Sequence, residues 1–418
     1  MSKWNQYRVG DICSAIYSGG TPSTSNEEYW DGDFYWLSSG ETANRYISKT
    51  DKTITQKGVD NSSTKLAKSG TLVMACAGQG KTRGQASILK CDTYINQSII
   101  AMVGKHELLD TTFLFYNMLL RYDELRMRSD ASSTRGSITT DMLKKLPISV
   151  PDLPTQKRIA DILSTYDDLI ENNNRRIALL EKSAQELYKE WFVRFRFPGY
   201  ENAKLENGLP EGWERTTFEK IASFQNGYAF KSNELLDSAE PNTYEVFKQG
   251  HIKRGGGFKA EGTKSWYHKS LCTGLQKFVL HKKDVLMAMT DMKDNVAILG
   301  NTAIMPYDNR YILNQRVGLL RPTHYRGTDF AYIHLLTNSY DFVQDLRSRA
   351  NRGVQVNLSA VQIRESETVV PSEIINKKFA KIMDPIFEEI FNIMIQSENL
   401  AKQRDLLLPR LMSGKLEV

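Results

Sequence analysis

The segment TQKRIADILSTYDDLIENNNRRIALLEKSAQELYKEWF, residues 155–192, places apolar side chains at spacings of three and four. The residues 220 positions further along repeat this pattern, so the chain is expected to contain one long amphipathic helix twice. At 1.5 Å per residue, about 38 residues make a helix of roughly 57 Å. The most economical partner for each apolar stripe is the other copy, packed antiparallel as in a coiled coil. The residues predicted to pack are Ile159, Ile162, Ile170, Ile177, Leu180, Leu187 and Trp191 in the first helix, and Phe379, Ile382, Ile390, Ile393, Leu400, Leu407 and Leu411 in the second.

Polar residues interrupt both stripes. Asn173 stands opposite an apolar residue of the second copy, and Ser397 and Arg404 replace apolar residues of the first. Either these side chains lie at the edge of the stripe, or they are buried and fix the register of the two helices. Pro385, with Asp384 as a possible N-cap, predicts that the second helix starts or kinks at this point.

The rest of the chain repeats as well. Trp4 matches Trp213, the strand-like run 72–75 (LVMA) matches 285–288 (VLMA), and Pro151 matches Pro371. Apolar runs at 71–77, 85–89, 94–103, 278–289, 296–304 and 311–320 predict strands, and 112–128 and 329–349 predict helices. The expected fold is therefore α/β (α+β), with two globular mixed domains, two long antiparallel coiled-coil helices and an internal pseudo-two-fold repeat. The predicted boundaries are 1–152 for the first domain, 153–198 for the central helix, 199–371 for the second domain with its linker, and 372–418 for the C-terminal helix.

Composition excludes several classes of protein. The 418 residues are 40% hydrophobic and 25% charged, as in globular proteins with real cores. The four cysteines and six histidines are scattered, which argues against a disulfide framework and a zinc site. Neither a signal peptide nor a membrane-spanning run is recognisable, so a cytoplasmic protein without a membrane partner is expected. Each globular segment carries a small positive excess, 18 Lys+Arg against 15 Asp+Glu in 1–150 and 22 against 19 in 200–371, which alone decides nothing.

The catalytic motifs that the chain suggests are incomplete. GQGKT at 78–82 resembles a phosphate-binding loop, but the required first glycine is replaced by Ala75, and a strand is expected to follow. Asp284, Asp291 and Lys293 are too closely spaced for a nuclease metal site and are expected to lie in a turn. No Pro-Pro pair occurs, so the amino-methyltransferase motif is missing. No catalytic residue, metal ligand or cofactor is predicted for this chain.

If the partner is DNA, the candidate contacts are basic residues in glycine-rich loops. Lysine and arginine neutralise phosphates, whereas Arg and Gln also pair with the edges of guanine and adenine. Because these loops differ between the two copies, the target is expected to consist of two different half-sites. The predicted DNA-binding residues are Lys81, Arg83, Lys90 and Arg135 in the first half, and Lys248, His251, Lys253, Arg254, Lys259, Arg349, Arg352 and Gln355 in the second.

The chain resembles the specificity subunits of type I restriction–modification enzymes over nearly its whole length. The resemblance rests on QKRIADIL (156–163), YKEWFVRF (188–195), GYAFKS (227–232) and LLLPRLMSGKL (406–416). It implies that the domains are target recognition domains, each for one half of a split site in double-stranded DNA. It also implies that the helices act as a spacer and bind two modification subunits, which restriction/translocase subunits join in the full complex. S-adenosylmethionine, ATP and Mg would then serve those partner subunits, and this chain would be non-catalytic.

Two other functions stay open at this point. A repeated coiled-coil adaptor could bind other proteins with both its helices and its globular domains. An ATP-dependent enzyme would have to use the incomplete GQGKT loop.

Overall fold

A computed structural model describes residues 4–78, 80–132, 136–293, 296–352 and 355–418. The chain forms two compact units, each built from one mixed α/β domain and part of both long helices. Unit 1 comprises residues 1–172 and 396–418, and unit 2 comprises residues 173–395. The predicted fold class is confirmed.

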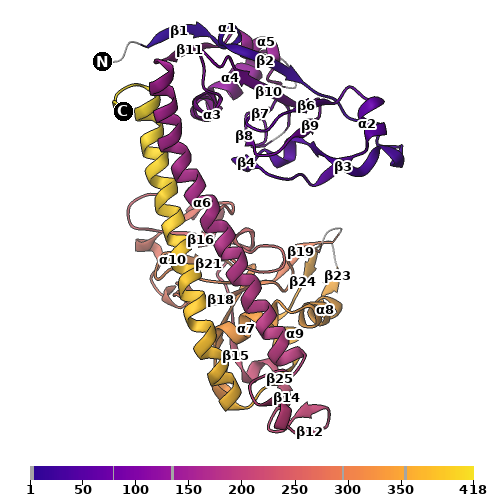
Figure 1. Cartoon of the computed structure of the whole chain (residues 1–418). Coiled ribbons are helices and arrows are strands. Elements are labelled where there is room, and N and C mark those ends of the chain that lie inside the picture. Colours follow the sequence, from indigo (N-terminus) through magenta and orange to yellow (C-terminus); the bar gives the residue numbers. More distant parts are fainter. Residues whose placement is uncertain (1–3, 79, 133–135, 294–295, 353–354) are drawn as a thin grey trace. The chain divides into compact units, whose positions relative to one another are not determined.

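The globular part of unit 1 contains two larger sheets, the two-stranded pair β1-β11, and short helices (Figure 1). One sheet has the strand order β2-β10-β7-β8-β4, and the other has the order β5-β3-β9-β6. The strands are β1 Asn5–Arg8, β2 Cys13–Ser18, β3 Trp30–Leu37, β4 Tyr46–Ile47, β5 Lys52–Ile54, β6 Lys65–Ala67, β7 Leu72–Ala75, β8 Ala86–Leu89, β9 Thr93–Ile95, β10 Ile99–Gly104 and β11 Pro147–Val150, and the helices include α1 Val9–Ile12, α2 Gln56–Asp60, α3 Thr111–Leu120, α4 Tyr122–Ser132 and α5 Thr140–Lys144.

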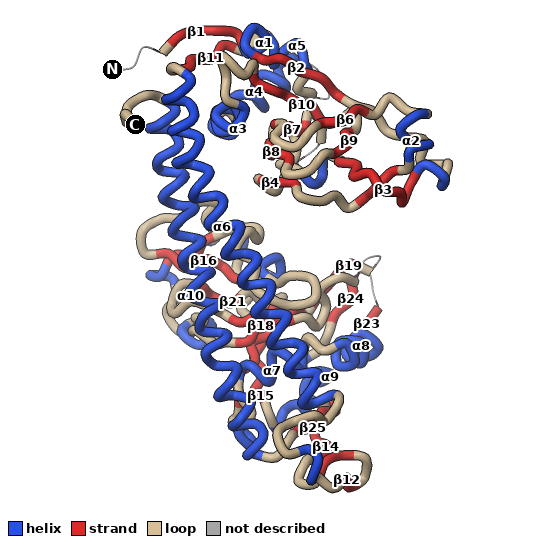
Figure 2. The backbone as a smooth tube through the Cα atoms, viewed as in Figure 1, coloured by secondary structure: helices blue, strands red, loops and turns tan. Residues whose placement is uncertain are grey.

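Unit 2 has a corresponding sheet in the order β15-β22-β18-β20, a second sheet in the order β17-β16-β21, and a third sheet, β19-β24-β23. Helices (blue) and strands (red) again alternate in its globular part (Figure 2). The elements are β12 Leu205–Glu206, β13 Leu209–Pro210, β14 Glu214–Thr217, β15 Ala222–Asn226, β16 Thr243–Phe247, β17 Trp266–His268, β18 Val285–Ala288, β19 Thr290–Met292, β20 Thr302–Ile304, β21 Tyr311–Leu313, β22 Val317–Pro322, β23 Asn351–Arg352, β24 Gln355–Asn357 and β25 Glu367–Val370, with α7 Phe330–Thr337, α8 Tyr340–Arg349 and α9 Ala360–Arg364.

The internal repeat is present in the structure down to single hydrogen bonds. In both units the first strand pairs antiparallel with the last strand before the long helix, β1 with β11 and β14 with β25. Asp110 caps α3 and Asp329 caps α7, each through a carboxylate that accepts a hydrogen bond from a backbone N–H. The side-chain amides of Gln156 and Asn376, 220 residues apart, donate to the carbonyls of Pro151 and Pro371. The two copies therefore share one framework.

The two long helices are α6, Leu153–Tyr188, which continues as the π-helical turn η3, Lys189–Val193, and α10, Glu373–Met412. In unit 2, Arg176 of α6 pairs with Glu389 of α10 at 2.7 Å, while the rings of Trp191 and Phe379 lie 5.5 Å apart. Residue numbers thus rise along one helix as they fall along the other. Within this unit the predicted antiparallel packing of the helices is confirmed.

The residues predicted to pack between the helices differ in how deeply they are buried. Ile159, Ile177, Trp191, Phe379, Ile390, Ile393 and Leu411 are buried, whereas Ile162, Ile170, Leu180, Leu187, Leu400 and Leu407 are partly buried. The prediction for Ile382 is wrong, because this side chain is 40% exposed and the neighbouring Met383 is buried in its place. Since 3.6 residues complete one turn, a stripe extrapolated at fixed spacing drifts around the helix.

The sequence predicted that the second helix starts or kinks at Pro385. The predicted start is wrong. α10 begins at Glu373 and runs through Pro385 as one helix to Met412. The pyrrolidine ring is exposed, and the flanking residues Met383 and Phe387 are buried in the apolar core. The packing of these neighbours stabilises the helix by more than the loss of one backbone hydrogen bond, which a proline cannot donate, destabilises it.

Candidate nucleic-acid interface

The predicted DNA contacts of the first repeat fall into three groups. Lys81 and Lys90 are exposed, and the Lys90 ammonium lies 4.0 Å from the centre of the Tyr46 ring. Arg83 is 7% exposed, and its Nη2 lies 2.5 Å from Oδ1 of Asp130. Arg83 therefore serves to hold α4 against the preceding loop, which corrects its prediction as a DNA contact. Arg135 lies outside the described residues.

The described residues of the loop 78–84 do not lead into a helix as a nucleotide-binding loop does. β8 follows it, as expected, where a phosphate-binding loop requires the N-terminus of a helix. The Tyr122 hydroxyl donates to the carbonyl of Lys81 at 2.7 Å, and Nη1 of Arg126 donates to the carbonyl of Arg83 at 3.1 Å. These bonds tie the backbone to α4 and leave the Lys81 side chain exposed.

His251, predicted as a DNA contact of the second repeat, belongs to the core. Its side chain is fully buried, with Nε2 at 3.5 Å from Oε1 of Glu245 and its ring beside Phe247 and Phe258. The prediction is therefore wrong: His251 lies inside the domain, although the segment around it is basic.

Glu245 carries the charge of this buried cluster. Burial alone would raise the pKa of its carboxyl, but the neighbouring His251 and the charges of Lys264 and Arg310 outweigh burial and lower the pKa. Lys264 and Arg310 lie 4.0 Å and 3.7 Å from the carboxylate, both partly exposed. The cluster thus anchors part of the basic segment 248–269 to β16.

The remaining predicted contacts of the second repeat lie at the surface to different extents. Arg254 and Lys259 are exposed, Lys248 and Lys253 are partly buried, and Lys253 pairs with Glu181 of α6 at 3.7 Å. Further along the chain, Arg349 at the end of α8 pairs with Asp345. Gln355 is the first residue of strand β24 and is partly buried. Arg352 belongs to β23, but its side chain lies outside the described part of the molecule.

The sequence did not single out Arg347, which lines a cleft together with the predicted contact Arg254. Its Nε and Nη2 donate to the carbonyls of Leu299 and Ala297 at 3.1 and 3.2 Å. Tyr340, 77% exposed at the start of the same helix, was also missed. The available signal was the i,i+2 arrangement of Arg347 and Arg349, but a charged helix end is more often plain surface.

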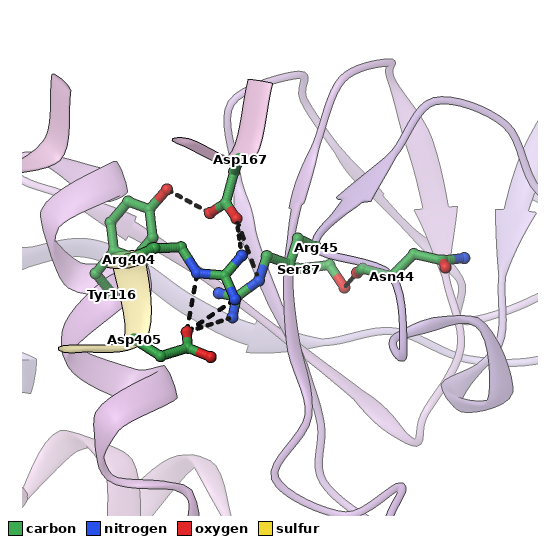
Figure 3. A network of polar contacts seen from close by, with 7 residues as sticks. All are labelled: Asn44, Arg45, Ser87, Tyr116, Asp167, Arg404 and Asp405. Carbon is green, nitrogen blue, oxygen red and sulfur yellow. Dashed lines mark hydrogen bonds and ion pairs between the residues drawn. The ribbon is translucent and has the colours of Figure 1, made fainter. Parts of the chain in front are cut away.

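A buried polar network joins α6, α10 and the globular part of unit 1 (Figure 3). The Asp167 carboxylate accepts hydrogen bonds from the Tyr116 hydroxyl, at 2.6 Å, and from Nη1 of Arg404, and it lies 3.3 Å from Nε of Arg45. Arg404 also donates to Asp405, from Nε at 3.0 Å and from Nη2 at 2.8 Å. The Asp167 and Arg404 side chains are only 2% and 8% exposed.

Burial decides between the two interpretations for two of the polar stripe residues. Asn173 and Arg404 are buried, and Ser397 is partly buried, so the first two do not lie at the edge of the stripe. Burial lowers the pKa of Arg404, but the charges of Asp167 and Asp405 outweigh it and raise the pKa, so the guanidinium stays charged.

The equivalent positions in unit 2 are apolar. Phe387 stands where Asp167 stands, and Ala184 stands where Arg404 stands. Phe387 packs on Phe330, Phe391 and His334 with ring centres 5.7–6.3 Å apart. The two units therefore use different chemistry at one and the same position of the repeat.

The acidic residues considered for a nuclease metal site have structural partners. Asp284 accepts two hydrogen bonds from Arg321, at 2.7 and 2.8 Å. Asp291 accepts hydrogen bonds from the N–H groups of Ile298 and Leu299. Among the described residues, no cluster of three or more His, Cys, Asp or Glu side chains is placed to hold a metal ion. The described helices include none with the length and apolar character needed to span a membrane.

Comparison with known proteins assigns the chain to a family. The model of the type I restriction modification DNA specificity domain matches it twice, over residues 1–182 and 210–402. The chain is 26% identical to the type I restriction enzyme MjaIX specificity subunit of Methanocaldococcus jannaschii, over 99% of this chain and 94% of that one. It is 22% identical to the HindI specificity subunit of Haemophilus influenzae over the full length of both. Its fold is similar to the type I restriction–modification S subunit from M. genitalium, with a TM-score of 0.58, 18% identity, and coverage of 98% of this chain and 96% of that chain. The chain therefore belongs to the family of type I restriction–modification DNA specificity subunits.

Proposed function

We propose that this specificity subunit recognises an asymmetric, bipartite DNA site, with one half-site read by each globular domain. The observation that carries the proposal is the repeat itself: two domains share strand order, helix caps and closing strand pairs. A framework that occurs twice in one chain is suited to two related binding events.

The differences between the repeats support an asymmetric target. The second domain carries the sheet β19-β24-β23 and the basic segment 248–269. The first offers Lys81 and Lys90 at the surface. Base contacts in the major groove depend on individual side chains, so domains with different loops read different sequences. The half-sites are accordingly unlike, and their sequence is not a palindrome.

The paired helices α6 and α10 act as the spacer between the half-sites and as the docking surface for two modification subunits. Exposed apolar side chains on both helices, Leu169, Leu179, Ile374 and Leu406 among them, support a protein partner along this pair. Restriction/translocase subunits complete the assembly, in the cytoplasm. S-adenosylmethionine, ATP and Mg serve those partners, whereas this chain is non-catalytic and binds no cofactor.

The test is to sequence the methylated positions in a genome that expresses the chain with its modification subunit. The expected result is one motif with two unlike specified halves separated by unspecified bases. A single contiguous motif, or no motif, contradicts the proposal.

A coiled-coil adaptor that binds only proteins makes a different prediction. Sequence-selective DNA binding by the assembled complex, weakening steeply with salt, is expected here and would be missing in the adaptor. The purified chain alone is expected to hydrolyse no ATP, and measurable turnover would revive the enzyme hypothesis.

A further inference from the structure

A cleft of about 460 Å³ in unit 2 gathers positive charge without a matching set of acids. Lys189 lines it from η3, Arg254 from the loop after β16, and Gln344 and Arg347 from α8. Asp341 is the one carboxylate among the described lining residues. Lys189 is already paired with Glu186 at 2.8 Å, so Arg254 and Arg347 are the two cations that make the cleft a candidate site for an anion.

Arg347 is held in place by neutral partners. The carbonyls of Leu299 and Ala297 accept hydrogen bonds from Nε and Nη2, which fixes the plane of the guanidinium without neutralising it. Among the described residues no carboxylate lies within ion-pair distance of Arg347. A guanidinium that is fixed and still charged is preorganised for an incoming anion.

Arg254 supplies the second cation from the segment KRGGG. The segment turns tightly, with φ of 80° at Gly255 and a hydrogen bond from the N–H of Lys253 to the carbonyl of Gly257. In the described part of the chain, the exposed Arg254 guanidinium has no hydrogen bond or ion pair. Burial lowers the pKa of Arg347, Asp291 opposes this effect, and the positive charge of Arg254 adds to it. Both arginines line the same cleft, so an anion bound there would be attracted by two positive charges.

We propose that this cleft binds a phosphodiester group of the DNA backbone between Arg254 and Arg347. The inference rests on the proposed function and adds to it a site that fixes the position of the DNA without reading a base. DNA is favoured over a free phosphate because exposed cations continue along both segments that form the cleft. Lys259 lies beyond the loop, and Arg349, which pairs with Asp345, lies at the end of α8.

Two substitutions test the site without touching the core. Arg254→Gln removes the exposed cation, and Gln344→Glu places a carboxylate on the exposed face of α8, three residues before Arg347, where it can occupy the position of the phosphate. The assembled complex with its modification subunits is titrated with a duplex that contains the mapped site, between 50 and 200 mM salt. Each variant is expected to bind roughly tenfold more weakly, and the slope of log K against log salt is expected to become shallower by about 1. The recognised sequence stays the same.

Matched controls separate this site from general surface charge. Arg254→Lys keeps the charge and is expected to keep the salt slope. Lys277→Gln removes an exposed cation of unit 2 that does not line the cleft, and it is expected to leave affinity and slope unchanged. Equal loss in Lys277→Gln and Arg254→Gln would overturn the proposal, because it would show a diffuse effect of net charge.

A parallel arm with inorganic phosphate and a mononucleotide distinguishes a free ligand from DNA. If phosphate raises the melting temperature of the wild type but not of Arg254→Gln, while DNA binding is unaffected, the cleft takes free phosphate and the DNA assignment is wrong. If wild-type DNA binding is selective and both variants keep its salt slope, the cleft assignment alone fails. If the wild type shows no selective binding, the proposed function fails instead.

Discussion

At the level of single residues, Asp167 is a buried side chain of unit 1 with three polar partners. It accepts hydrogen bonds from Tyr116 and Arg404 and lies beside Arg45, in a site that is nearly closed to solvent. Replacing a buried ion pair with apolar groups is often neutral, but removing one partner leaves an uncompensated charge. The network therefore determines which pairs of substitutions the helix pair tolerates.

We expect Asp167→Leu to lower the free energy of unfolding of unit 1 by about 3 kcal/mol, since Arg45 and Arg404 lose their buried counter-charge and keep only the exposed Asp405. Urea unfolding of the full chain, followed by circular dichroism, measures the change. The double variant with Arg404→Met should recover part of the loss. Arg176→Ala, which breaks the half-exposed pair with Glu389, is the matched control and should cost less than about 1 kcal/mol. A similar cost for both single variants would contradict the assigned role of the buried network.

His334 makes unit 2 sensitive to acid. Burial lowers the pKa of its imidazole to about 3, and Thr302 and Phe387 pack around the ring. The unfolded chain has a His pKa near 6.5, so below that pH it takes up a proton that the folded unit does not. The folded state therefore has its full stability above pH 6.5 and loses stability as the pH falls from 6.5 towards 3. The loss approaches about 1.4 kcal/mol per pH unit below 6.5.

The measurement is the melting temperature between pH 7 and pH 4 for the wild type, His334→Gln and His106→Gln. His334→Gln should reduce the fall of stability with acid, and His106→Gln, which replaces an exposed histidine, is the matched control. If His334→Gln and the wild type lose stability in parallel, another group controls the acid response.

At the level of helices and strands, period-3.6 spacing was sufficient to predict both long helices, and the runs of apolar residues predicted most strands. The mistakes have physical causes. Ile382 was assigned by extrapolating a fixed spacing, whereas Met383 is the residue that packs. Pro385 predicted a helix start because local propensity was considered without the core that holds its neighbours. Composition indicated that 248–269 is basic, but it could not show that His251 turns inward to Glu245.

Pro385 lies within α10 at an exposed position, so its replacement should strengthen the helix. We expect Pro385→Ala to raise the free energy of unfolding of unit 2 by about 1–3 kcal/mol, through a restored backbone hydrogen bond and better propensity. Guanidinium unfolding measures the change. A destabilised variant would mean that the proline ring contributes packing that its exposure does not reveal.

If the helix pair is a spacer, its length should set the number of unspecified bases. Removing one heptad from α6 and the facing heptad from α10 keeps the buried faces aligned and shortens the pair by about 10 Å. At 3.4 Å per base pair, the methylated motif should lose about three unspecified positions. Mapping the motif of the shortened complex checks this, and an unchanged spacing would exclude the helices as the ruler.

At the level of the whole molecule, the repeat makes each globular domain a separable part. Exchanging residues 1–152 for the corresponding domain of a relative should change one half of the motif and leave the other half intact. Sequencing the methylated motif of the hybrid is the measurement. Changes in both halves would show that the two domains do not read independently.

The contacts at the ends of the helices have a consequence for the order of the parts along the chain. Trp213 begins the second repeat packed on Phe192 and Phe197, at the end of the first helix. Trp4 begins the first repeat, and Gly414, just past the end of the second helix, lies against its indole. Each repeat thus starts where the helix of the other one finishes, so the connectivity is effectively cyclic. A permuted polypeptide that joins the present termini and opens near Gly199 should preserve every strand pairing. The reason is that the two junctions between the repeats are equivalent, so the chain can be opened at either one.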